Sequence, residues 1–121
     1  MNTPVSFELS KELKEKGFDE QSLTIYQDGE ILFLKSTISN SQFLTSRNYT
    51  APTIADVVMW LYEKHGIWIL VNLSLVGKWY YDTYTIKDGL PKHNSYSKIE
   101  RFNSPTEAYE AAITYTLKNL I

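Results

Sequence analysis

The apolar and polar positions in the first third of the chain predict an antiparallel pair of strands. Leu23-Thr24-Ile25-Tyr26 alternates with the period of two that is typical of a strand, and the apolar run Ile31-Leu32-Phe33-Leu34 follows soon after it. Between these runs lies Asp28-Gly29, a pair that favours a tight hairpin turn. We therefore expect strands at residues 23–27 and 31–35 that pair in antiparallel fashion.

Two further segments have apolar residues at the spacing of a helix with one buried face. The first covers residues 7–16, with Ser6 as its N-cap and Gly17 as the left-handed residue that ends it. The second begins after the N-cap Thr53 and closes at His65-Gly66. Its expected buried face consists of Ile54, Val57, Val58 and Leu61.

A last helix is predicted near the end of the chain. It begins at Ser104-Pro105-Thr106-Glu107, a capping box with proline at the first helical position, and runs to about Asn119. Its expected buried stripe consists of Tyr109, Ala112, Ile113, Thr116 and Leu120.

The region between the last two helices predicts more strands. Strands are expected at residues 67–73 and 78–86, and a short fifth strand is indicated near residues 96–101. Asp88-Gly89 and Pro91 mark a turn before that fifth strand.

The order of elements is therefore α-β-β-α-β-β-(β)-α. Because tight hairpins make neighbouring strands antiparallel, this order predicts an α+β fold in which three helices pack on a mainly antiparallel sheet of four or five strands. Helices on both faces of that sheet are the alternative. The length of 121 residues, without repeats or Pro/Gly-rich linkers, indicates a single domain over residues 1–121.

The segment from Ser36 to Thr50 has no periodic pattern. Most of its residues are Ser, Thr or Asn, whose side chains compete for backbone hydrogen bonds. We expect a long loop here. A loop of this length is either functional or mobile, and mobility is the favoured interpretation.

Aromatic density is the one unusual feature of the composition. Adjacent residues of a strand point to opposite faces, so the hairpin at residues 67–86 has large apolar side chains on both faces. Something has to cover the second face: a helix, a second copy of the chain or a partner. The resulting candidate interaction surface consists of Trp68, Leu70, Trp79, Tyr80, Tyr81 and Tyr84.

Three interpretations of this surface stay open. The aromatic side chains form an ordinary core if helices lie on both faces. Otherwise they form a protein-binding or self-associating face, because Trp and Tyr are enriched among interface anchors. The third interpretation is a platform on which nucleic-acid bases stack, favoured by a small excess of cations over residues 78–101. The net charge of −2 makes nucleic acid the less favoured partner.

No pattern of residues predicts catalysis, a metal or a cofactor. Cysteine is absent, which excludes disulfides, thiolate metal sites and cysteine nucleophiles. His65 is explained by the end of a helix, where it complements the helix dipole, and His93 has no partner that the sequence can assign. Neither a glycine-rich phosphate loop nor a nucleophile elbow is present. We therefore expect that the protein is not an enzyme and binds no cofactor.

The sequence also gives an expectation about location. The longest apolar run, Ile67-Trp68-Ile69-Leu70-Val71, is far shorter than the roughly 20 residues that cross a bilayer. The amino-terminal residues lack the basic and apolar regions of a signal peptide. These features predict a cytoplasmic protein with no membrane contact.

One resemblance spans most of the chain. Ala51-Pro52-Thr53-Ile54, followed by Trp60-Leu61-Tyr62-Glu63-Lys64-His65-Gly66-Ile67, is similar to small uncharacterised proteins encoded in bacterial phage and prophage genomes. The matching residues are core and cap residues, so the resemblance implies a shared fold and a mobile-element origin, and it carries no activity. The function predicted is that of a non-enzymatic accessory domain that binds a protein or a second copy of itself. The alternative is a weak nucleic-acid-binding module that uses the aromatic hairpin.

Overall fold

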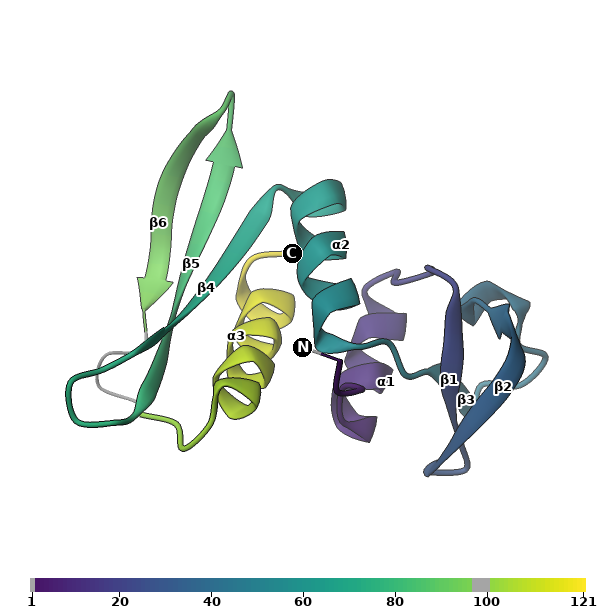
Figure 1. Ribbon diagram of the computed structural model, residues 1–121. Coiled ribbons are helices and arrows are strands. Elements are labelled where there is room, and N and C mark those ends of the chain that lie inside the picture. Colours follow the sequence, from purple (N-terminus) through teal and green to yellow (C-terminus); the bar gives the residue numbers. More distant parts are fainter. Residues whose placement is uncertain (1, 97–100) are drawn as a thin grey trace.

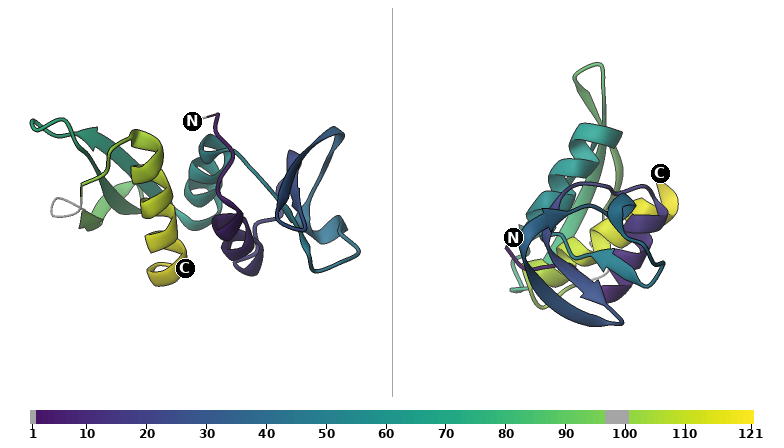
Figure 2. Two further views of the ribbon diagram at one scale, coloured as in Figure 1. Left: turned by 90° about the horizontal axis from the view of Figure 1, so that it is seen from below. Right: turned by 90° about the vertical axis from the view of Figure 1, so that its right-hand side faces the viewer.

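In residues 2–96 and 101–121, which the computed structural model describes, three helices lie between two antiparallel sheets (Figures 1 and 2). The helices are α1 (Phe7–Glu15), α2 (Ile54–His65) and α3 (Pro105–Asn119). The first sheet has the order β2-β1-β3 and consists of β1 (Ser22–Gln27), β2 (Glu30–Ile38) and β3 (Asn48–Thr50). The second sheet has the order β4-β5-β6 and consists of β4 (Ile67–Leu73), β5 (Trp79–Lys87) and β6 (Leu90–Tyr96).

The predicted α+β class, the three helices and the antiparallel hairpin at the Asp28-Gly29 turn are confirmed. The expected single sheet of four or five strands is wrong in detail, because the described residues form two sheets of three strands. The physical reason is that β3 occupies the second edge of β1, from Ile25 to Gln27. The first sheet is thus complete without the later strands, which pair among themselves on the other side of the helices.

The fifth strand expected near residues 96–101 lies earlier in the chain, as β6. Residues 97–100 are outside the described part. Pro91 was expected in a turn, but it lies in β6 opposite Ile86. Proline is tolerated there because β6 is an edge strand, where a missing backbone N–H leaves no gap in the ladder.

The helix ends are those that the sequence predicts. The side chains of Ser6, Thr53 and Ser104 each accept a hydrogen bond from the backbone N–H three residues later. Gly66 ends α2 in the left-handed conformation with a φ of 66°. A Cβ atom at Gly66 would lie 3.1 Å from the carbonyl oxygen of Ile86, so this glycine also lets β5 approach closely.

The core lies where α2 and α3 meet each other, α1 and the second sheet. The residues predicted for the buried face of α2 are all buried. In α3, Tyr109 and Leu120 are only partly buried, and Ala108 and Leu117 are buried instead. The buried stripe of α3 is shifted because this helix contacts β4, β5, α1 and α2 at once. The core cluster consists of Val5, Leu9, Leu13, Phe18, Ile54, Val57, Val58, Trp60, Leu61, Ile69, Tyr81, Ala112, Ile113 and Leu117.

The first sheet contributes none of the residues of this cluster and is attached by other contacts. Phe7 of α1 makes edge-on ring contacts with Tyr26 at 5.5 Å and with Tyr49 at 5.8 Å. Lys14 donates to the carbonyl of Asn48 and lies 5.1 Å from the centre of the Tyr49 ring. The first sheet is therefore fixed to α1 by aromatic and polar contacts.

The segment from Ser36 to Thr50 is more regular than predicted. β2 continues to Ile38, the short 3-10 helix η1 (Asn40–Gln42) follows, and β3 pairs with β1. The side chain of Asn40 explains why this segment is regular. Its buried side chain donates to the carbonyl of Phe18 at 2.8 Å and accepts from the N–H of Thr50 at 2.9 Å, so it links the end of α1 to β3. The sequence pattern did not show that one of the polar side chains would be buried.

Asn40→Ala should lower the free energy of unfolding by about 2–4 kcal/mol, because it leaves a buried carbonyl and a buried N–H without partners. Chemical denaturation measures this change, and amide exchange at Thr50 should become faster. Asn119→Ala is the matched control, since its side-chain hydrogen bond to the carbonyl of Tyr115 is exposed. Equal effects of the two substitutions would contradict the role given to Asn40.

Tyr26 attaches β1 to the segment before α1. Its hydroxyl donates to the carbonyl of Val5 at 2.7 Å. Burial raises the pKa of Tyr26, and the nearby carboxylate of Glu110 raises it further. The same carboxylate accepts from the backbone N–H of Ser6 at 2.9 Å, so α3 also fixes the start of α1.

The raised pKa of Tyr26 predicts a loss of stability in alkali. The unfolded chain releases this proton near pH 10, whereas the folded chain holds it to higher pH. The stabilisation is fully present below about pH 10 and is lost as the pH rises through the folded pKa. Between about pH 9 and 11, the free energy of unfolding should fall more steeply with pH in the wild type than in Tyr26→Phe. The control is Tyr62→Phe, which alters an exposed side chain and should leave the pH dependence of the wild type unchanged.

Candidate functional site

In the described part of the chain, helices cover the second sheet on one face and not on the other (Figures 1 and 2). α2 and α3 pack against that face, where Ile67, Ile69, Tyr81 and Thr83 are buried. The alternate residues of the strands point the other way. The side chains on this second face, which we call the open face, include Trp68, Leu70, Asn72, Tyr80, Asp82, Tyr84 and His93.

The six candidate residues divide between the two faces. Tyr81 is buried under α3, with its ring stacked on Phe102 at 6.2 Å and tilted against Tyr115 at 6.4 Å. Trp79 shares the face of Tyr81, and its backbone pairs with Phe102. The other four candidates lie on the open face: Trp68, Leu70, Tyr80 and Tyr84.

A row of aromatic rings crosses one end of the open face. Tyr62 at the end of α2 contacts Trp68 edge-on at 5.7 Å. Trp68 lies directly opposite Tyr84, and Tyr84 contacts His93 edge-on at 5.1 Å. The row therefore combines the rings of Tyr62, Trp68 and Tyr84 with the imidazole of His93.

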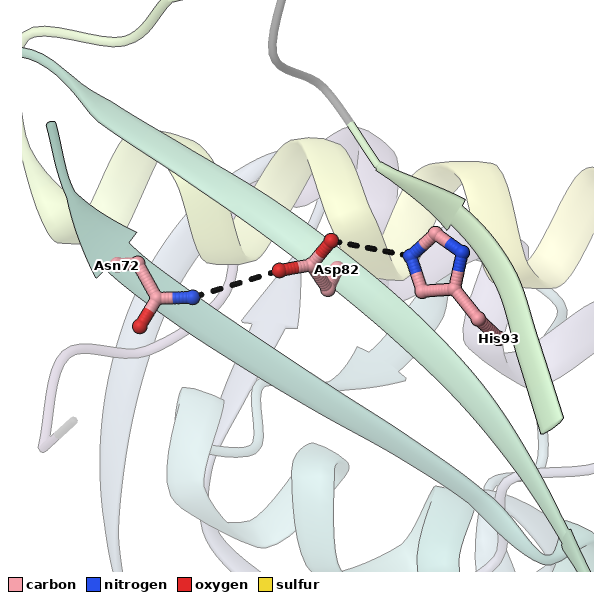
Figure 3. Close-up of polar contacts among 3 residues, drawn as sticks. All are labelled: Asn72, Asp82 and His93. Carbon is pink, nitrogen blue, oxygen red and sulfur yellow. Dashed lines mark hydrogen bonds and ion pairs between the residues drawn. The ribbon is translucent and has the colours of Figure 1, made fainter. Parts of the chain in front are cut away.

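Three polar side chains form a row across the same face (Figure 3). We call this row, made of Asn72, Asp82 and His93, the polar line. One carboxylate oxygen of Asp82 lies 3.0 Å from Nε2 of His93, and the other accepts from the amide nitrogen of Asn72 at 3.4 Å. The side chain of Asp82 is only 16% exposed. A carboxylate with so little access to water depends on these donors, and it holds His93 and Asn72 in fixed orientations.

The sequence did not assign these polar roles. In the sequence, Asp82 is one of several anions, and no residue near His93 indicates which side chain its ring would contact. The signal that could have found them is the hairpin register: a turn at Asp88-Gly89 brings residues near position 93 opposite those near 84. His93 lies directly opposite Tyr84 and reaches Asp82 diagonally on the same face of the sheet.

A second feature missed by the sequence analysis is the tip of the β4–β5 hairpin. Ser74 and Lys78 close a three-residue loop in which Gly77 takes the left-handed conformation. Leu75 and Val76 occupy the tip and are 107% and 73% exposed. Apolar residues in a loop where polar ones are usual could have indicated an exposed apolar tip.

One surface hollow of about 390 Å³ lies away from the open face, between Gly17 and α2. It is lined by Lys16, Gly17, Asp19, Glu20, Trp60, Lys64 and His65. Beside it, the backbone N–H of Ser41 donates to Asp19 at 2.7 Å and lowers the pKa of that carboxyl. His65 is exposed at the end of α2, as predicted, and packs edge-on against Trp60 at 4.8 Å.

Comparison with protein-family models, curated proteins and solved structures finds no match for this chain. The resemblance to phage and prophage proteins therefore stays a prediction. Within the described part of the chain, no group of three or more His, Asp and Glu residues could hold a metal ion. None of the described helices has the length and apolar character that crossing a membrane requires.

The geometry of the polar line predicts the tautomer of His93. An ionised carboxylate only accepts hydrogen bonds, so the Nε2 atom that faces Asp82 must carry the proton when the ring is neutral. Nitrogen chemical shifts of the labelled imidazole should show the Nε2–H form in the wild type and a loss of this preference in Asp82→Ala. His65 lies at the end of α2 and not beside Asp82, so its imidazole serves as the internal control. A neutral His93 protonated on Nδ1 in the wild type would refute the assignment.

Proposed function

We propose that the protein is a non-enzymatic binding domain that docks onto a partner protein through the open face of the second sheet. The observation that carries this proposal is that an antiparallel sheet has a helix layer on one face and aromatic side chains on both. Of the apolar residues on the open face, Trp68 also packs against the core cluster, whereas Leu70 is exposed. Leu70, at the centre of that face, is 41% exposed.

The open face has the composition of an interface core. Trp and Tyr are the residues that most often anchor protein interfaces, because they bury large areas with few rotatable bonds. Each 100 Å² of apolar surface that a partner covers contributes about 2.5 kcal/mol before the costs of association. The polar line from Asn72 to His93 would set the orientation, since a partner that covers it has to present polar groups of complementary charge.

Stacking of nucleic-acid bases on the same rings is the alternative function. The aromatic row supports it. The carboxylate of Asp82 near the middle of the face and the net charge of −2 count against it, because both repel phosphates. We therefore favour a protein partner.

The test is a pair of matched substitutions that add one negative charge each. Leu70→Asp changes the open face, whereas Leu90→Asp changes an exposed leucine beside the β5–β6 turn. Partners captured by the wild-type protein are purified, and their affinities for the three proteins are measured by calorimetry. We expect Leu70→Asp to weaken binding by about 30-fold, which is roughly 2 kcal/mol, and Leu90→Asp to leave it unchanged.

Circular dichroism confirms that each variant is folded. A partner bound equally well by both variants would place the interface elsewhere and would contradict the proposal. Binding of single-stranded nucleic acid that falls only weakly with salt would favour the alternative function, because base stacking, unlike phosphate contact, releases few counterions.

A further inference from the structure

The β4–β5 hairpin ends in exposed apolar side chains. Leu75 and Val76 occupy the loop, and we call this pair the apolar tip. Leu73, at the end of β4, is also exposed behind them. Figure 1 and the left view of Figure 2 show this loop at the outer edge of the molecule. Apolar side chains gathered on a protruding loop, unlike single ones spread over a surface, indicate a contact site.

The turn that presents the apolar tip is held by its own hydrogen bonds. The N–H of Ser74 donates to the carbonyl of Lys78 at 2.7 Å, and the carbonyl of Ser74 accepts from the N–H of Gly77 at 3.1 Å. The hydroxyl of Ser74 accepts from the N–H of Lys78 at 3.3 Å. Because these polar groups already have partners within the turn, moving the tip out of water costs less than it would for an open loop.

Two cations lie behind the apolar tip. Lys78 follows the loop directly, and its ammonium group donates to the side-chain carbonyl of Asn103, which is neutral and leaves the charge in place. An antiparallel bridge joins Trp79 to Phe102, so Arg101 lies two residues further from the tip than Lys78. Both cations are exposed. The outer end of the hairpin therefore combines apolar side chains with positive charge.

Few anions oppose these two cations. The sequence over residues 73–81 contains no Asp or Glu. Among the described residues, the carboxylate of Glu107 accepts from the N–H of Asn103 at 3.1 Å in the first turn of α3, where the positive end of the helix offsets its charge. Asp82 lies further along β5, beside His93. The charge at the tip suits an anionic surface.

We propose that the apolar tip inserts into the surface of a membrane that contains anionic lipids. The order of side chains along the hairpin supports a lipid surface. The aliphatic pair comes first, Lys78 follows three residues after Leu75, and the rings of Trp79 and Tyr80 come next. Because a strand advances about 3.3 Å per residue, these groups lie within about 10 Å of the tip.

A bilayer surface has its polarity in the same order. Acyl chains lie deepest, the anionic headgroups lie above them, and Trp and Tyr are enriched at the boundary between the two. An interfacial segment buries its apolar side chains about 5–10 Å into that boundary. With Leu75 and Val76 at this depth, the ammonium group of Lys78 reaches the headgroups. A pocket on a protein imposes no such order along the hairpin.

The tip enters the interface and does not cross the membrane. The expectation of no membrane contact rested in part on the absence of a long apolar run, which only a crossing segment needs. Two aliphatic side chains and two cations form a weak anchor, so binding should be reversible and should depend on anionic lipid.

Vesicle flotation tests the proposal with phosphatidylcholine alone and with phosphatidylcholine that contains about 30% phosphatidylserine. The wild type should bind the anionic vesicles and not the neutral ones, and added salt should weaken binding. Leu75→Asp should weaken binding by about tenfold, because a charge replaces an inserted side chain. Leu90→Asp is the matched control, since Leu90 is an exposed leucine beside the other turn of the same sheet.

A second pair of variants tests the cations. Lys78→Glu should weaken binding to the anionic vesicles, whereas Lys87→Glu, an equal change of charge at the far end of β5, should have little effect. Nitroxide-labelled lipid in small bicelles should broaden the amide signals of residues 74–77 and leave those of residues 88–90 unchanged. All four substituted side chains are exposed, and circular dichroism checks that each variant is folded.

Leu70→Asp separates this proposal from the binding role of the open face, because it should leave vesicle binding intact. Absence of binding to the anionic vesicles would overturn the proposal, and so would equal binding to both lipid mixtures. Equal losses in Leu75→Asp and Leu90→Asp would overturn it as well. A protein partner lost in Leu75→Asp, with vesicles left unbound by the wild type, would show that the tip contacts protein instead.

Discussion

One layer of three helices has to support two sheets, and most features of the structure follow from this constraint. The main helix contacts are made by β4 and β5 in the second sheet and by β3 in the first, so the helices lie on one side of each sheet. No second helix layer covers either outer face in the described part. The apolar residues on those outer faces, together with the unpaired edge of β2, remain in contact with water.

The two sheets meet the helix layer in different ways. The second sheet contributes Ile69 and Tyr81 to the core and is held by apolar burial. The first sheet is held by the rings of Phe7, Tyr26 and Tyr49 and by hydrogen bonds from a few polar side chains. Directional contacts of this kind fix geometry well but contribute less per residue than a core does. We therefore expect the first sheet to be the less stable half.

The open face of the second sheet and the edge of β2 present different chemical groups. The open face presents side chains, with an aromatic row and a polar line that meet at His93. The edge of β2 presents backbone N–H and C=O groups. The two surfaces are on different sheets.

The sequence by itself determined the local elements, because caps, turns and helical spacing act over a few residues. Ser6, Thr53 and Ser104 cap helices as predicted, and both Asp-Gly pairs close hairpins. Only the tertiary structure decided which strands share a sheet, since pairing depends on contacts between distant residues such as Asn40 with Phe18 and Thr50. It likewise placed Tyr81 in the core and Asp82 beside His93. Alternation along a strand shows that two faces exist, but the packing of α2 and α3 decides which of them is buried.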